Sequence, residues 1–319
     1  MGTTREQRTE QALCRGFSLT LENPAYRDAV CAFASILLRT DLAPSDLTAE
    51  ALGIRDRQVA AKIVSRDGGV VAGLPEIGLL WKTHGIRTEF VKADGDEIRP
   101  GDEILRGTGS EKTLLELERV GLNLLQRMSG IATAGRCLQE RVRRCGSATR
   151  VVGTRKTPCG LLDKRALHLG NGGTHRLSLS DAILIKNNHL ALLASREVDA
   201  APIAIERAWQ ARRNSAFIEI EVRGEDAARA AASTFRRLQE ENTEEYPCLL
   251  MLDNMSRAQI ESILRMLRSE GLWDHTLVEA SGGISEKNIE AYAECGVDAI
   301  SIGALTHSVR ALDICQRIS

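Results

Sequence analysis

Residues 277–304, LVEASGGISEKNIEAYAECGVDAISIGA, decide the fold of this chain. A short apolar run over 277–280 is followed by two glycines and then by helical spacing over 285–294. A second apolar run over 299–302 again ends in a glycine. An apolar strand, a loop, a helix and another apolar strand form the repeating unit of a parallel sheet covered by helices.

The same alternation extends back to residue 150. Further apolar runs lie at 150–152, 182–185, 218–222 and 249–252, and helical patterns at 202–214, 225–240, 256–270 and 308–317. An open, doubly wound sheet would have a glycine-rich phosphate turn after its first strand. Here Thr154-Arg155-Lys156-Thr157 follows the first strand and the glycines follow the last ones, which favours a β/α barrel with a phosphate site in its final loops.

The first part of the chain has a mixed α+β pattern. Residues 24–39 have helical spacing, and 41–54 look like a loop in which Ser45 or Asp46 is a turn or cap residue. Strands are predicted over 58–66, 70–74, 89–92 and 103–108, with a hairpin at Asp67-Gly68-Gly69. A helix over 113–144 follows, with an interruption near Ser129-Gly130.

Composition excludes several classes of protein. The chain has 319 residues, with 42 Lys+Arg against 43 Asp+Glu, so a nucleic-acid or membrane-surface binder is not expected. No apolar run approaches the roughly 20 residues that span a bilayer, and the N-terminus lacks the apolar core of a signal peptide. The eight cysteines are scattered without a CxxC pair, which indicates reduced thiols in a cytoplasm and no zinc site.

The polar residues at the predicted strand ends carry the functional prediction, because the chemistry of a β/α barrel sits at the carboxyl ends of its strands. Glu221 and Asp253 end neighbouring strands as a carboxylate pair, and Glu219 shares a strand face with Glu221. The loops 281–283 and 303–304 offer bare backbone N–H groups to a phosphate. The cationic group comprises Arg155, Lys156, His175, Arg176 and Lys186.

This combination predicts a small, polyanionic, phosphorylated substrate, with carboxylates for hydroxyl groups or Mg²⁺. Each feature alone also has a structural explanation, such as a solvated loop, a capping pair or a glutamate paired with an arginine. Their joint occurrence at strand ends is what favours a site. A Schiff-base lyase with Lys186 as nucleophile and a non-catalytic ligand sensor are the alternatives that these residues leave open.

Several long motifs give the chain a family resemblance, from about residue 24 to the end. It resembles the quinolinate phosphoribosyltransferases, also called carboxylating nicotinate-nucleotide pyrophosphorylases. The motifs are SDLT (45–48), RDGGVVAG (66–73), ERVGLNLLQRMSGIAT (118–133), TRKT (154–157), HRLSLSDAILIKNNH (175–189), EIEV (219–222), MLDNM (251–255), EASGGIS (279–285) and SIGALTHS (301–308).

The resemblance implies an α/β chain of type II phosphoribosyltransferase architecture, with an N-terminal α/β sandwich domain and an incomplete, TIM-like β/α barrel. We place the sandwich at 13–115 and the barrel at 116–307, with 1–12 disordered and a C-terminal helix over 308–319 that packs back on the N-terminal domain. The implied enzyme is a cytoplasmic, homodimeric pentosyltransferase of NAD biosynthesis. It joins quinolinate to phosphoribosyl pyrophosphate with Mg²⁺, giving nicotinate mononucleotide, pyrophosphate and CO₂.

The resemblance also implies a role for each site residue. Catalysis falls to Lys156, Lys186, Glu221 and Asp253, of which the two carboxylates face the ribose hydroxyls and Mg²⁺, and the two lysines reach the phosphoribosyl pyrophosphate or a substrate carboxylate. The carboxylates of quinolinate are held by Arg119, which enters the neighbouring subunit's site, and by Arg155, His175 and Arg176. The 5′-phosphate is bound through the backbone of Ser281, Gly282, Gly283 and Gly303.

The chain departs from the family pattern beside the predicted pocket. The family usually reads DTRKTTPG where this chain reads GTRKTPCG at 153–160, and the following loop is about two residues shorter. Asn187 replaces a carboxylate, and Arg223 stands where an acidic residue is common. A paralogue that ribosylates another pyridine or carboxylated base is therefore a further alternative.

Overall fold

The computed structural model describes residues 3–42 and 45–318, which form two compact units. The first, here called the barrel unit, contains Met1–Arg15, Cys137–Lys156 and Gly172–Ala304. The second, the sandwich unit, contains Gly16–Arg136, Thr157–Asn171 and Leu305–Ser319. The predicted domains followed one another along the chain with a boundary near residue 115, whereas each observed unit combines three separate segments.

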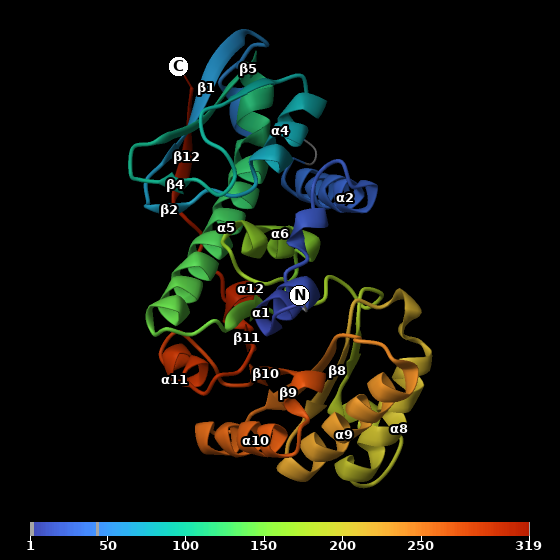
Figure 1. Cartoon of the computed structure of the whole chain (residues 1–319). Coiled ribbons are helices and arrows are strands. Elements are labelled where there is room, and N and C mark those ends of the chain that lie inside the picture. The colour runs from blue at the N-terminus through green and yellow to red at the C-terminus, as the bar shows by residue number, and fades with distance from the viewer. Residues whose placement is uncertain (1–2, 43–44, 319) are drawn as a thin grey trace. The chain divides into compact units, whose positions relative to one another are not determined.

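The barrel unit is built on a parallel six-stranded sheet (Figure 1). Its order is β6-β11-β10-β9-β8-β7, and a single parallel bridge from Val152 to Gly173 extends it beyond β6. The edge strands β6 and β7 do not pair with each other, so the barrel is incomplete, as predicted. The strands are β6 (Arg150–Gly153), β7 (Ile183–Ile185), β8 (Ile218–Val222), β9 (Cys248–Asp253), β10 (Leu277–Ser281) and β11 (Ala299–Ile302).

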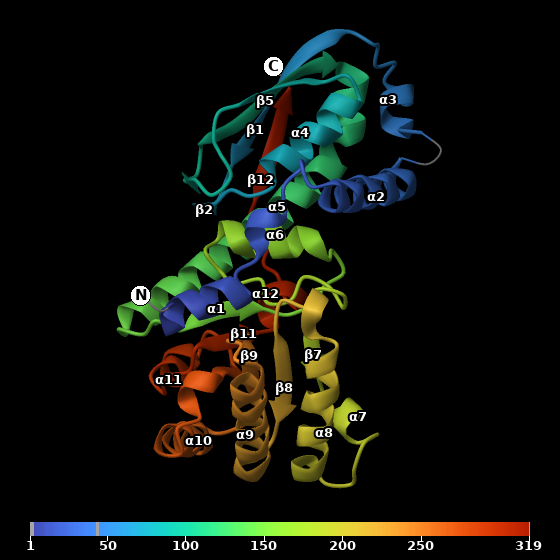
Figure 2. The ribbon, with the colours of Figure 1, turned by 45° about the vertical axis from the view of Figure 1, so that its right-hand side comes forward.

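Helices lie along the outside of this sheet, and Figure 2 shows α8 and α9 side by side. Half of the buried residues of α9 are alanines, which allows the helix to approach its neighbours closely. A capping box between Ser256 and Gln259 fixes the start of α10. The helices after the strands are α7 (Asn187–Leu190), α8 (Glu197–Gln210), α9 (Glu225–Asn242), α10 (Arg257–Ser269) and α11 (Ile289–Ala293).

The N-terminal segment is a helix, so the prediction that residues 1–12 are disordered is wrong for the described part. Helix α1 (Arg5–Leu13) begins with a capping box between Thr4 and Gln7. Its few apolar residues, Ala12 and Leu13, are buried in a cluster with residues from four barrel strands. The sequence looked unstructured because this helix is polar on most of its surface, and its partners lie far away in the chain.

Arg5 fixes α1 to the barrel unit through its guanidinium group. Its Nε and Nη2 each donate to Asp298 at 2.6 Å, and its remaining donors reach the carbonyl oxygens of Trp273 and Thr276 at 2.7 Å. The guanidinium also stacks 3.4 Å from the centre of the Trp273 ring. Burial raises the pKa of Asp298, and the charge of Arg5 opposes that rise.

Replacing Arg5 with alanine should lower the free energy of unfolding of the barrel unit by about 2–4 kcal/mol, because Asp298 would remain buried without its cation. Urea unfolding followed by circular dichroism measures the change. Arg8→Ala is the matched control, since among the described residues Arg8 of the same helix donates only to the main-chain carbonyl of Asp274. Equal stabilities of the two variants would show that the Arg5 contacts do not hold α1.

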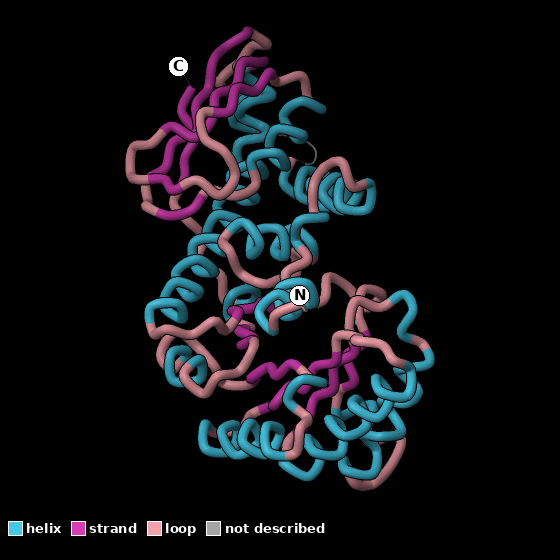
Figure 3. Tube along the Cα trace, in the orientation of Figure 1, coloured by secondary structure: helices cyan, strands magenta, loops and turns pink. Residues whose placement is uncertain are grey.

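The sandwich unit has an antiparallel four-stranded sheet in the order β12-β1-β5-β3 (Figure 3). The core between this sheet and its helices includes Trp81, Leu105 and Leu125. Its strands are β1 (Gln58–Ser65), β3 (Arg87–Phe90), β5 (Glu103–Ser110) and β12 (Ile314–Ile318), and its helices include α2 (Pro24–Asp41), α3 (Leu47–Ala51), α4 (Leu74–Thr83) and α6 (Leu161–Leu169). Helix α5 (Glu111–Arg144) starts in this unit and ends in the barrel unit.

Two predictions for the sandwich unit, a C-terminal helix and a β-hairpin, are wrong. The predicted C-terminal helix over 308–319 does not form in its described part, and Ile314–Ile318 is instead strand β12, which pairs with β1 from Ala61↔Ile318 to Ser65↔Ile314. The Asp67-Gly68-Gly69 hairpin does not form, because β12 and β5 already pair with both edges of β1. Instead β2 (Gly69–Val70) pairs with β4 (Glu97–Ile98). Both errors arise from pairing with segments that are distant in the sequence.

A predicted loop and a predicted interruption of a helix also need correction. Residues 41–54 contain α3, which Asp46 caps by accepting from the N–H groups of Thr48 and Ala49, while residues 43–44 lie outside the described residues. Helix α5 continues through Gly130 without a break. A side chain at Gly130 would meet the carbonyl oxygen of Arg310 at 2.2 Å, so this glycine serves a close approach between two segments of the sandwich unit.

No helix of the described chain combines the length and the apolarity needed to cross a membrane.

Candidate active site

A pocket of about 280 Å³ lies in the barrel unit at the carboxyl ends of the strands. The structure brings eight of the predicted site residues together around it: Arg155, Lys156, His175, Arg176, Lys186, Glu221, Asp253 and Ser281. Arg119 lies on α5 in the sandwich unit, with an exposed side chain. Gly282, Gly283 and Gly303 are not among the lining residues.

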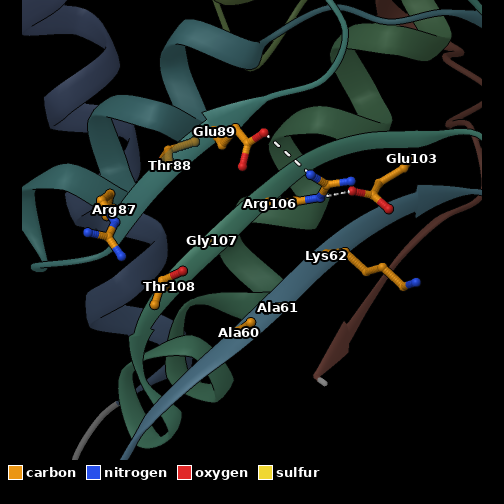
Figure 4. Close-up of a pocket in the computed structure, with 10 residues that line it drawn as sticks. All are labelled: Ala60, Ala61, Lys62, Arg87, Thr88, Glu89, Glu103, Arg106, Gly107 and Thr108. Atoms are coloured by element: carbon orange, nitrogen blue, oxygen red, sulfur yellow. Dashed lines mark hydrogen bonds and ion pairs between the residues drawn. The ribbon is translucent and has the colours of Figure 1, made fainter.

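A larger hollow, of about 610 Å³, lies on the outer face of β1, β3 and β5 in the sandwich unit (Figure 4). Of its two arginines, Arg87 and Arg106, the second is paired with Glu103 and, at 3.4 Å, with Glu89. The remaining lining is mostly small or neutral, including Ala60, Gly107 and Thr108, and none of the predicted site residues lies there. The smaller pocket is therefore the candidate site.

Arg155 and Arg176 form the cationic wall of the pocket. Arg155 lies in the loop after β6 and is exposed, whereas only 8% of the surface of Arg176 is accessible. Burial lowers the pKa of Arg176, and the nearby positive charge of Arg155 lowers it further. Two guanidinium groups that repel each other in one pocket are stabilised when an anion binds between them.

His175 has an unusual backbone conformation that is fixed on several sides. Its φ angle of 53° lies in the left-handed region, which is unfavourable for a residue with a side chain. The backbone N–H donates to the carbonyl oxygen of Leu13 at 2.8 Å, and the ring Nδ1 accepts from the N–H of Arg176 at 2.7 Å. The ring packs edge-on against Phe217 at 5.4 Å. This turn determines where the Arg176 side chain begins.

Two glutamates lie against the other ring nitrogen of His175. Nε2 is 2.8 Å from an oxygen of Glu219 and 3.3 Å from an oxygen of Glu279, and neither carboxylate is exposed. We describe these contacts as ion pairs from their distances. They are not described as hydrogen bonds, because none of the carboxylate oxygens has a well-aligned donor among the described residues. Glu219 and Glu279 come from alternate strands, β8 and β10, which contribute to the same interior layers of a barrel.

No role is predicted for Glu279 from the sequence, although it carries the same signal as Glu219. Both are charged residues within strands that are otherwise buried and apolar, and such residues are costly unless they are paired. The three groups offer one nitrogen and two carboxylate oxygens within 4.8 Å of one another, so they can share a proton or hold a metal ion. Their partnership was not visible in the sequence because His175 is about a hundred residues away from Glu279.

The cluster binds a proton tightly. Burial alone would lower the pKa of His175, but the charges of Glu219 and Glu279 outweigh burial and raise it to about 9. The backbone N–H of Arg176 points at Nδ1 and so disfavours protonation of that nitrogen. The two buried carboxylates favour a protonated ring, and we take their effect on the pKa of His175 as the stronger one. Burial and the charge of Glu279 likewise raise the pKa of Glu219, while His175 and Arg176 lower it.

Stability should therefore fall at alkaline pH. Because the pKa of His175 is raised from 6.5 to about 9 in the folded state, its contribution is complete below pH 6.5 and is lost between pH 6.5 and 9. The loss is expected to be on the order of 3 kcal/mol. Urea unfolding at a series of pH values measures it. Glu279→Gln removes one of the two carboxylates and should flatten the slope, and an unchanged slope in that variant would contradict this assignment.

Lys186 and Asn187 surround the carboxylate of Glu221. The ammonium group of Lys186 is 3.4 Å from one oxygen of Glu221, and the side-chain amide of Asn187 donates to the other. Lys186 is half-exposed, and Glu221 is largely buried at the end of β8. Asn187, which departs from the family pattern, thus orients a carboxylate that the sequence assigned to the site.

Asp253 lies beside the loop with the paired glycines. It ends β9 in register with Ser281, and the next residue, Asn254, donates from its backbone to the carbonyl oxygen of Ser281 at 2.8 Å. A side chain at Gly282 would meet the amide of Asn254 at 2.3 Å, so packing alone requires glycine there. Gly283 also has a positive φ, of 65°, but has open space around it. Of these two glycines, Gly283 is thus the one that is open to a ligand.

Comparison with known proteins agrees with this arrangement. Family descriptions match two parts of the chain: "Quinolinate phosphoribosyl transferase, N-terminal domain" over residues 46–129 and the corresponding C-terminal domain over 131–316. A probable carboxylating nicotinate-nucleotide pyrophosphorylase of Methanothermobacter thermautotrophicus is 38% identical over 285 residues, covering 88% of this chain and 96% of the relative. The carboxylating nicotinate-nucleotide pyrophosphorylase of Mycobacterium leprae is 36% identical, covering 84% and 89%.

The structural comparison leads to the same proteins. The solved nicotinate-nucleotide pyrophosphorylase of Francisella tularensis superposes with a TM-score of 0.78 at 27% identity, covering 92% of this chain and 96% of that one. The similarity thus includes both units, and most of the relatives' length is present here. The chain belongs to the quinolinate phosphoribosyl transferase family.

Proposed function

We propose that this chain transfers the phosphoribosyl group of phosphoribosyl pyrophosphate to quinolinate, with release of pyrophosphate and CO₂ and formation of nicotinate mononucleotide. The observation that carries the proposal is the pair of arginines, Arg155 and Arg176, facing one small pocket beside the carboxylates Glu221 and Asp253. The two arginines suit the two carboxylates of a dicarboxylate base. The two carboxylates stabilise the positive charge that develops on the ribose during the reaction. The relatives' names, carboxylating nicotinate-nucleotide pyrophosphorylases, support this assignment.

The residues explain the two halves of the reaction. Loss of pyrophosphate from the ribose C1 develops positive charge on the sugar, which Glu221 and Asp253 stabilise. Lys156 and Lys186 offset the negative charge that accumulates on the leaving pyrophosphate. Decarboxylation then breaks the bond between ring carbon 2 and its carboxylate and leaves the electron pair on that carbon, where the adjacent positively charged ring nitrogen stabilises it. A proton from water at this carbon completes nicotinate mononucleotide, so no protein base is required. Catalysis is mainly positioning and electrostatics.

His175 has a different role from the one that the resemblance implied. Both of its ring nitrogens face protein groups, namely Glu219 with Glu279 on one side and the N–H of Arg176 on the other. We therefore assign it a positioning role: it holds the left-handed turn that presents Arg176 and contributes positive charge below the pocket. Direct binding of the quinolinate carboxylates is left to Arg155 and Arg176 of the pocket, together with Arg119 if it enters from a second copy.

Mg²⁺ is part of the proposal, and the residues fit it. Glu221 and Asp253 supply carboxylate oxygens, the ligands that Mg²⁺ prefers, and both line the pocket. These two residues would hold the ion or its water molecules, and when bound it would supply positive charge to the pyrophosphate. The pair is not free in this structure, because Lys186 and Arg223 lie within 4.0 Å of its oxygens.

We also propose a homodimer in which Arg119 enters the site of the neighbouring subunit. Its exposed side chain on α5 supports this role, since an arginine on the surface is available to a second copy. Cross-linking or light scattering tests the assembly, and Arg119→Ala should raise KM for quinolinate if the residue is shared. A cytoplasmic location also remains a proposal, and it is based on the eight scattered cysteines. The role in NAD biosynthesis follows from the proposed product, nicotinate mononucleotide.

A substrate panel tests the proposed function against its alternatives. Quinolinate, nicotinate and other pyridine carboxylates are each offered with phosphoribosyl pyrophosphate, and quinolinate should have the highest kcat/KM. A higher value for another base would identify the chain as a paralogue with a different substrate. A borohydride-trapped adduct on Lys186 would indicate a Schiff-base lyase, although the contact of Lys186 with Glu221 suits a charged ammonium better than a nucleophilic amine.

A further inference from the structure

Arg223 follows β8 directly and turns its side chain toward the two site carboxylates. Its Nη2 lies 4.0 Å from Glu221 and its Nε lies 3.8 Å from Asp253. Its own backbone N–H is anchored at 2.9 Å by the carboxylate of Glu197 at the start of α8. The guanidinium is 60% exposed, so it contacts both carboxylates from the solvent side of the pocket.

The charges around this pair cancel. Glu221 and Asp253 contribute two negative charges, while Lys186 at 3.4 Å and Arg223 at 3.8–4.0 Å contribute two positive ones. Asn187 occupies the remaining contact of Glu221, and the amide of Asn254 donates to Asp253 at 2.9 Å. A divalent cation is attracted to a site with a net negative charge and free oxygen ligands. In this chain Arg223 and Lys186 offset the negative charge, so the first condition is not met while Arg223 is in place, and several oxygens of the pair are already in contact with side chains.

We propose that Arg223 is an internal cation that keeps divalent metal away from the Glu221–Asp253 pair in the free protein and that binds the pyrophosphate once the substrate arrives. The exposed arginine has the freedom to turn from the carboxylates to an incoming polyanion, and its planar group suits a phosphate. The second half of this inference rests on the proposed function, whereas the first half concerns the protein without substrate.

Metal binding to the free chain tests the first half. Mn²⁺ is titrated into the full chain without substrate, and free Mn²⁺ is followed by electron paramagnetic resonance. The wild type should show no binding at this pair in the low millimolar range, and Arg223→Gln should create a site at least tenfold tighter. Combining Arg223→Gln with Asp253→Asn should remove the gained site. Arg213→Gln, at another exposed arginine of the same unit, should behave as the wild type.

The inference fails if the wild type and Arg223→Gln bind Mn²⁺ equally, or if the gained site survives Asp253→Asn.

Calorimetric binding of phosphoribosyl pyrophosphate at a fixed Mg²⁺ concentration tests the second half. Arg223→Gln should weaken it about tenfold and Arg223→Lys should recover only part of the loss, because lysine keeps the charge but loses the planar fork that suits a phosphate. Equal affinities would refute that half. If the wild type did not bind this substrate at all, the proposed function would fail while the Mn²⁺ result kept its meaning.

Discussion

Replacing Arg155 with alanine should reduce kcat/KM for quinolinate by about 10²–10³-fold, with the folded structure unchanged. Removing one partner of a desolvated, hydrogen-bonded ion pair costs about 2–5 kcal/mol. Arg155 is exposed in the free protein and shares the pocket with Arg176, so its charge stabilises the bound substrate rather than the fold. Steady-state rates of nicotinate mononucleotide formation measure the loss, and circular dichroism checks the fold.

Two further variants make the Arg155 result specific. Arg155→Lys keeps the charge but loses the forked geometry, so it should recover only part of the activity. Arg213→Ala removes an exposed arginine of the same unit that does not line the pocket and should leave the rate unchanged. If Arg155→Ala retained the wild-type rate, the pocket would not be where quinolinate binds.

Lys186→Ala should lower kcat by about 10²–10³-fold, the range found when one electrostatic group that stabilises a transition state is removed. The substitution removes a cation from the leaving pyrophosphate and also takes from Glu221 an ion-pair partner at 3.4 Å. Single-turnover measurements at saturating substrate separate the effect on chemistry from the effect on binding. Lys186→Arg keeps the charge and should be less impaired.

An effect of Lys186→Ala confined to KM would contradict the assigned role. It would place Lys186 in ground-state binding, because an interaction that is equally strong in substrate and transition state lowers KM without changing kcat. A wild-type rate in this variant would remove Lys186 from the site altogether. Since the side chain is half-exposed, the fold is expected to tolerate the substitution.

The barrel strands could be predicted from the sequence because parallel strands are buried on both faces and appear as short apolar runs. Each of the six predicted runs coincides with a strand, from β6 to β11. Elements that depend on distant partners could not be predicted in this way. Helix α1 depends on Arg5 reaching Asp298, and strand β12 depends on pairing with β1.

The candidate site was predictable to a similar extent and for a similar reason. Strand ends converge in any β/α barrel, so charged residues at those ends, such as Arg155 and Asp253, were expected to meet. The sequence could not predict which contacts each side chain makes in the assembled site, and therefore which role it has there. The glutamates beside His175 and the N–H of Arg176 face its two ring nitrogens, which is why we propose that it positions Arg176 rather than binding a carboxylate.

Two of the departures from the family pattern, Asn187 and Arg223, also gain a physical meaning together. Asn187 donates to Glu221, and Arg223 contacts both Glu221 and Asp253. A carboxylate in place of Asn187 would add a negative charge beside Glu221, whereas the amide and the guanidinium lower the negative charge around it. In this chain the carboxylate pair is therefore less negative than the family pattern would make it.

Release of labelled CO₂ from quinolinate tests the central claim most directly. Quinolinate carrying carbon-13 in the carboxyl group at ring position 2 is incubated with phosphoribosyl pyrophosphate, Mg²⁺ and the full chain, and both products are quantified. The account predicts one labelled CO₂ for each nicotinate mononucleotide, no release without phosphoribosyl pyrophosphate, and almost none with Arg155→Ala. Nucleotide formation that keeps the label, or no product from quinolinate under these conditions, would contradict it.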